Sequence, residues 1–150
     1  GPRAGSRPPQ EPELPLMLTT LTPMGYHTHV KEETRPWVAL ADADLAAAKV
    51  LLKEGLHAPS VFHCQQAIEK ALKAIWVEAR DEIPPRTHNL VDLARELDLL
   101  HDDWRAFLAD LTNQAVATRY AGRGNYPGHV AQMYYLETEK LCVQLRQRLK

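Results

Sequence analysis

The side chains with the clearest chemistry in this sequence gather in one short glycine-rich segment, residues 118–129. Among them are Arg119, Arg123, Asn125 and His129. Arginine offers a planar fork of donors to phosphate oxygens, glycine lets the backbone approach a phosphate closely, and histidine titrates near neutral pH. The segment therefore has the residue types of an anion-binding or acid–base site.

These residues could cleave RNA without a metal ion. His129, acting as a general base, would remove the proton from a ribose 2′-hydroxyl, while Arg123 would stabilise the negative charge that develops on the phosphorane. A plain surface loop is the competing interpretation, because an arginine and a histidine at this spacing also occur together by chance. The segment alone does not choose between a catalytic site and such a loop.

Two further polar groups precede this segment. One helical face gathers five polar side chains, Gln65, Gln66, Glu69, Lys70 and Lys73. We predict a solvated face with a favourable Glu69–Lys73 pair four residues apart, and a surface for a partner protein is the alternative. His88 comes just before a predicted helix start, where a packing or capping role is the simplest expectation.

The elements that must position these residues are all helical. Apolar residues recur at helical spacing in five segments, and no segment alternates with a period of two for long enough to predict a strand. Pro36 suits a first helical turn, Gly55 a helix stop and Asn89 an N-cap. The predicted helices span about residues 36–54, 59–83, 90–100, 102–120 and 130–149. Such helices with short connections predict an all-α, antiparallel up-and-down bundle of about five helices.

Composition divides the 150 residues into two parts. Seven of the 11 prolines lie within the first 36 residues. Residues 1–33 also show no sustained period, so we predict a flexible Pro-rich tail there. Residues 34–150 form the predicted bundle domain. With 45% hydrophobic residues, the chain has enough apolar side chains for one core of ordinary size.

Charge and cysteine content exclude several classes of protein. The chain carries 18 basic and 19 acidic side chains, a net charge of -1, so any RNA or nucleotide site must be local rather than a broad basic face. Cys64 and Cys142 are too few for a disulfide scaffold.

No apolar run is long enough to span a membrane, which favours a cytoplasmic protein. His27 and His29 have no cysteine or acidic cluster beside them, so we expect no metal and no organic cofactor.

Three motifs together resemble the HEPN family, the higher eukaryotes and prokaryotes nucleotide-binding domains. They are residues 65–74 (QQAIEKALKA), 87–90 (THNL) and 118–120 (TRY). Asp44, Leu45 and the stretch of residues 51–55 resemble the first helix of the family. The resemblance covers roughly residues 36–150 and implies an all-helical bundle that usually forms a homodimer.

The resemblance implies two functional classes. Many members are metal-independent endoribonucleases, in which an arginine and a histidine are separated by four to six residues and two copies of the motif meet in a dimer cleft. Arg123 and His129 are separated by five residues and fit this pattern. On this interpretation Arg123 and His129 are catalytic, and Arg119 and Asn125 bind the phosphate of RNA or of a nucleotide.

Other members resemble companions of minimal nucleotidyltransferases in toxin–antitoxin pairs. The chain would then be a non-catalytic nucleotide-binding or adaptor module whose partner is a nucleotidyltransferase. In one such group the partner modifies a tyrosine two residues after the motif histidine. Position 131 of this chain is Ala131, so that modification does not carry over.

Overall fold

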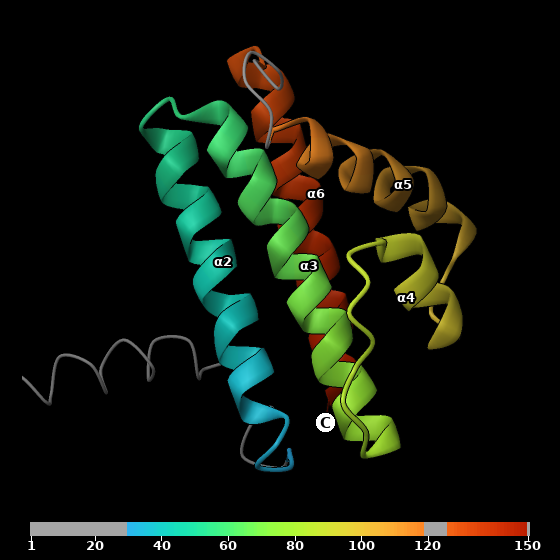
Figure 1. Ribbon diagram of the computed structural model, residues 1–150. Coiled ribbons are helices and arrows are strands. Elements are labelled where there is room, and N and C mark those ends of the chain that lie inside the picture. The colour runs from blue at the N-terminus through green and yellow to red at the C-terminus, as the bar shows by residue number, and fades with distance from the viewer. Residues whose placement is uncertain (1–29, 119–125, 150) are drawn as a thin grey trace, which may run out of the picture.

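The computed structural model describes residues 30–118 and 126–149, which form α-helices and a closing 3₁₀ turn (Figure 1). The helices are α2 (Arg35–Lys53), α3 (His57–Arg80), α4 (Leu90–Glu96), α5 (Asp102–Ala117) and α6 (Gly128–Arg146), and the turn is η4 (Gln147–Leu149). The described segments contain no strand, so the predicted all-α class is confirmed. Residues 1–29, which make up most of the predicted tail, lie outside the described residues.

The helices begin and end close to the predicted residues. Pro36 lies in the first turn of α2, and Gly55 follows the helix with a φ of +78° that suits glycine. Asn89 caps α4, because its side-chain oxygen accepts hydrogen bonds from the backbone of Val91 at 3.0 Å and of Asp92 at 3.1 Å. Helices α3 and α6 each start two residues and end three residues earlier than predicted, and α4 ends at Glu96, four residues earlier than predicted.

Helix α3 lies at the centre of the bundle. It packs against α2, α4, α5, α6 and η4. Helices α2 and α3 lie side by side and antiparallel, α6 runs along the other side of the pair, and α4 and α5 cover the remaining flank of α3 (Figure 1). Thus each of the other helices rests on α3, and its residues form the middle of the core.

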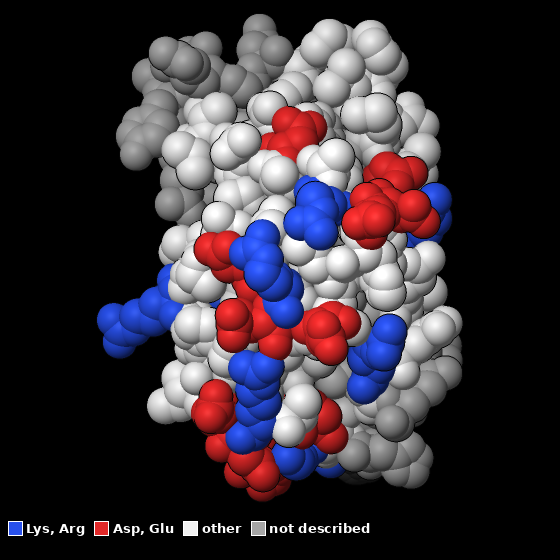
Figure 2. Space-filling model, turned by 90° about the vertical axis from the view of Figure 1, so that its right-hand side faces the viewer, with Lys and Arg blue, Asp and Glu red and all other residues white. Residues whose placement is uncertain are grey.

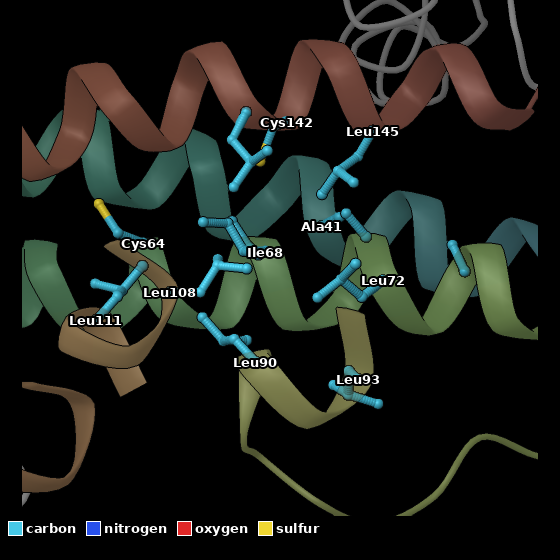
Figure 3. Close-up of a cluster of buried hydrophobic side chains, with 14 of the residues drawn as sticks. Ala41, Cys64, Ile68, Leu72, Leu90, Leu93, Leu108, Leu111, Cys142 and Leu145 are labelled. Atoms are coloured by element: carbon cyan, nitrogen blue, oxygen red, sulfur yellow. The ribbon is translucent and has the colours of Figure 1, made fainter. Parts of the chain in front are cut away.

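The core is built around Ile68 and Leu72 of α3, which are at most 1% exposed. In Figure 3 they lie between Cys142 and Leu145 of α6 on one side and the leucines of α4 and α5 on the other. Polar contacts join α2 to α3 and to α6. Ser60 donates to the carbonyl of Ala48 at 2.7 Å, and Asp42 of α2 forms a buried ion pair with Arg146 of α6. Among the described helices, none is long and apolar enough to cross a membrane.

Replacing Leu72 by alanine should lower the free energy of unfolding by about 2–5 kcal/mol, because a cavity forms in the helix that the others contact. Urea denaturation followed by far-UV circular dichroism measures the change. Leu136→Ala is the control, since Leu136 of α6 is 50% exposed, and it should lower stability by less than about 1 kcal/mol. Equal losses in the two variants would contradict a core centred on α3.

The two cysteines should be unreactive in the folded protein. Burial raises the pKa of both thiols to about 12, although the neighbouring Thr138 side chain acts in the opposite direction on Cys64. Because the thiolate is the nucleophile, iodoacetamide should label neither cysteine at mildly alkaline pH and both after urea is added. Mass spectrometry reads the labelling, and rapid modification of the native protein would show the burial to be wrong.

Candidate functional site

Of the four predicted site residues, the structure places one. His129 is the second residue of α6, and its side chain is exposed. Arg119, Arg123 and Asn125 fall in residues 119–125, outside the described residues. The described part of the candidate site is therefore His129 together with the helix ends around it.

Two helices begin at the end of the bundle where His129 lies. Figure 1 shows the first turns of α3 and α6 at the same end, with the last turn of α5 close by. The residues before the two helices, Leu56 and Pro127, have no side-chain acceptor, so neither caps its helix. Uncapped backbone N–H groups and the helix dipoles favour an anion, such as a phosphate, at such ends.

His57, the first residue of α3, joins this end to α6. Its Nδ1 lies 2.9 Å from the backbone carbonyl oxygen of Tyr126. The same ring faces Gly128, where an added Cβ would lie 3.5 Å from Cε1 and 3.6 Å from Nε2 of His57. His57 is half-buried. It therefore holds the backbone that leads directly into the turn carrying His129.

Two tyrosines connect α6 and its N-terminal approach to α5. Tyr126 donates a hydrogen bond to the side chain of Gln114, and Tyr134 donates to Asp110 at 2.5 Å. Their rings meet edge to face, with 5.9 Å between centroids. Burial, together with the charge of Asp110, raises the pKa of both phenols. Both hydroxyls therefore stay protonated at neutral pH and fix α5 relative to α6.

The prediction of a solvated face on α3 is wrong for three of its five side chains. Gln65, Glu69 and Lys73 are only 1%, 2% and 5% exposed. Glu69 accepts hydrogen bonds from Gln65 at 3.2 Å, Lys73 at 2.9 Å and His88 at 3.0 Å. The cause is tertiary: the segment between α3 and α4 turns back along α3 (Figure 1) and brings His88 over these side chains.

The carboxyl group of Glu69 is charged inside the protein. Burial acts to raise its pKa, but the hydrogen bonds from Lys73 and His88 outweigh that effect and hold the pKa below its ordinary value. The Lys73 ammonium is the matching cation, with its side chain 7% exposed. Each of the two charges is compensated only while the other is present, so the pair constrains how α3 and the segment before α4 can pack.

A second polar cluster ties α2 to α3. Asp44 lies 2.9 Å from Nδ1 of His63 and accepts from Lys70 at 3.2 Å. Gln66 accepts from Lys70 at 3.2 Å and donates to Gln65 at 2.7 Å. The two clusters thus form one chain of hydrogen bonds along α3. Because these groups bind one another, we assign them a structural role.

The charged surface elsewhere is mixed in sign. On the face shown in Figure 2, lysine and arginine side chains are interleaved with aspartate and glutamate side chains, so that face presents no broad basic field. In the described part of the chain, no three His, Cys, Asp or Glu side chains are grouped so that they could hold a metal ion. The end of the bundle that carries His129 remains the candidate site.

Comparison with known proteins points to one family. The HEPN domain family model matches residues 34–143. A protein of Methanocaldococcus jannaschii named "Putative toxin MJ1304" is 46% identical over 41 residues, which are 27% of this chain and 27% of that protein. The chain thus spans about a quarter of the length of this relative. The crystal structure of TT1696 from Thermus thermophilus is similar with a TM-score of 0.70 and 25% identity, over 80% of this chain and 100% of that one.

No pattern in the sequence includes His57 in the candidate site. It lies 69 positions before Tyr126, the residue whose carbonyl it binds. Its only local signal is its place at the start of a helix, which is also the place of His129. The fold brings the two helix starts together, so His57 can be assigned to the site only from the tertiary structure.

Glu69→Gln should lower the free energy of unfolding by about 3–5 kcal/mol at neutral pH, because it leaves the Lys73 ammonium buried without a counter-charge. The lowered pKa of Glu69 stabilises the folded state above the unfolded-state value of about 4.3. This contribution disappears as the pH falls through the folded-state pKa. The difference between the two proteins should therefore shrink below about pH 4.

Urea denaturation across a pH series measures that difference. Glu137→Gln is the matched control, since Glu137 is 50% exposed and lies 3.7 Å from Lys140. It should change stability by less than about 1 kcal/mol at any pH. A similar loss in both variants would show that the burial of Glu69 does not matter.

Proposed function

This chain belongs to the HEPN domain family, and we propose that it is a metal-independent endoribonuclease that serves as the toxin of a toxin–antitoxin pair. One observation carries the proposal: His129 is exposed at the start of α6, directly after the sequence segment that contains Arg123. The similarity over 41 residues to the protein named "Putative toxin MJ1304" supports the biological role.

In the proposed reaction His129 is the general base. Its imidazole takes the proton of the ribose 2′-hydroxyl, and the 2′-oxygen attacks the adjacent phosphorus. Arg123 stabilises the charge on the phosphorane, and Arg119 and Asn125 bind phosphate oxygens. The uncapped starts of α3 and α6 add a positive potential at the same end of the bundle. No step calls on a cofactor.

A homodimer is part of this proposal. The chain has a net charge of -1, so a single copy attracts RNA only weakly over long range. Two copies that meet at the His129 end would double the arginines in one cleft. We therefore propose that the active form is a dimer, and that the antitoxin is a nucleotidyltransferase that binds it.

The second candidate function is a non-catalytic nucleotide-binding or adaptor module. The lack of a broad basic field on the face in Figure 2 favours it, since such a module needs to bind one phosphate group and not a long RNA. Arg119 and Arg123 would then hold the phosphate, and His129 would have no chemical role. Cleavage assays separate the two functions.

His129→Ala should lower RNA cleavage by at least about 100-fold, because general-base catalysis contributes that much or more. The measurement is cleavage of labelled RNA by the purified protein in the presence of EDTA. His101→Ala is the matched control, since His101 is also an exposed histidine at a helix start, and it should cleave like the parent protein.

Arg123→Ala should cause a comparable loss of cleavage, because it removes the group that stabilises the phosphorane. Far-UV circular dichroism checks that each variant is folded. If His129→Ala cleaves like the parent, the catalytic assignment is wrong. If the parent binds nucleotides without cleaving RNA, the adaptor function is the correct one.

A further inference from the structure

Two imidazoles lie at the same end of the bundle, from helices far apart in sequence. His129 is exposed in the first turn of α6, and His57 opens α3. The two are linked through Gly128, which directly precedes His129 and whose added Cβ would contact the ring of His57. The end of the bundle that carries His129 therefore also carries a second imidazole, which the sequence did not assign to the site.

The contact with Tyr126 fixes the protonation pattern of His57. A backbone carbonyl oxygen only accepts hydrogen bonds, so the Nδ1 that lies 2.9 Å from it carries a hydrogen. In the neutral ring, Nε2 then holds a lone pair and is the atom that gains and loses a proton. Nε2 and Cε1 are the ring atoms next to Gly128, where an added Cβ would lie 3.6 Å and 3.5 Å from them, and glycine places no side chain over either atom.

Cleavage of RNA by attack of the 2′-oxygen needs an acid as well as a base, because the departing 5′-oxygen is a poor leaving group until it is protonated. We propose that His57 is a second catalytic residue of this site, the general acid that protonates the 5′-oxygen. The assignment rests on the proposed ribonuclease function and extends it from one histidine to two.

These two residues account for both proton transfers of the reaction. His129 takes the 2′-hydroxyl proton as the bond from the 2′-oxygen to phosphorus forms. The bond from phosphorus to the 5′-oxygen breaks, and the protonated His57 gives its Nε2 proton to that oxygen. The products are a 2′,3′-cyclic phosphate and a free 5′-hydroxyl, and solvent returns each histidine to its starting state. The hydrogen bond from Nδ1 to Tyr126 is kept throughout.

His57→Asn separates catalysis from positioning. The asparagine amide can donate to the carbonyl of Tyr126 as Nδ1 does, but it has no group that replaces Nε2. Two substrates are compared, an RNA oligonucleotide and uridine 3′-(4-nitrophenyl phosphate). The nitrophenolate of the second substrate leaves without protonation, so its cleavage needs the base and not the acid.

We expect His57→Asn to lower RNA cleavage by at least about 100-fold and to cleave the nitrophenyl ester at nearly the parent rate. The fall in RNA cleavage on the alkaline side of the parent pH profile, where a general acid loses its proton, should disappear. His129→Ala should be inactive on both substrates. Gly128→Ala should slow RNA cleavage and leave the ester unaffected, because its methyl group would cover Nε2 at an ordinary contact distance.

Several results would overturn the assignment. RNA cleavage by His57→Asn at the parent rate, or an equal loss on both substrates, would show that His57 is not the acid. Nitrogen-15 NMR of the neutral imidazole must also show hydrogen on Nδ1, and hydrogen on Nε2 would refute it independently of activity. If the parent protein cleaves neither substrate, the proposed function itself is wrong and the role of His57 as an acid is wrong with it.

Discussion

The buried carboxylate of Glu69 connects two parts of the chain, helix α3 and the segment before α4. It accepts hydrogen bonds from its own helix through Gln65 and Lys73, and from the segment before α4 through His88. A carboxylate that is 2% exposed is stable only with all of its partners in place. The path of the chain from α3 to α4, and with it the position of α4 on α3, therefore depends on this one group.

Most of the fold could be predicted from local signals. The stop at Gly55, the cap at Asn89 and the apolar spacing depend on short stretches of sequence, and the structure has the helices close to those residues. The burial of Gln65 and Glu69 could not be predicted in this way. A polar face on an amphipathic helix indicates solvent unless another segment covers it, and that covering is a tertiary event.

The two histidines of the candidate site differ in the same way, since one has a local sequence signal and the other depends on a tertiary contact. His129 was found from residue type and its spacing from Arg123, which are properties of one short segment. His57 carries no such signal, because its link to the site depends on the tertiary arrangement in which the parallel helices α3 and α6 begin at the same end of the bundle. Charge composition, in contrast, was informative from the start, since a nearly neutral chain has no broad basic face and any phosphate site on it must be local.

The tyrosine contacts between α5 and α6 have a consequence for how this protein can diverge. Tyr126 with Gln114 and Tyr134 with Asp110 anchor both flanks of residues 119–125 through side chains that lie outside that segment. Anchoring thus does not depend on which residues stand between the flanks, and loop length itself has only a modest effect on stability. Substitutions between the two flanks can therefore accumulate while the bundle retains its fold.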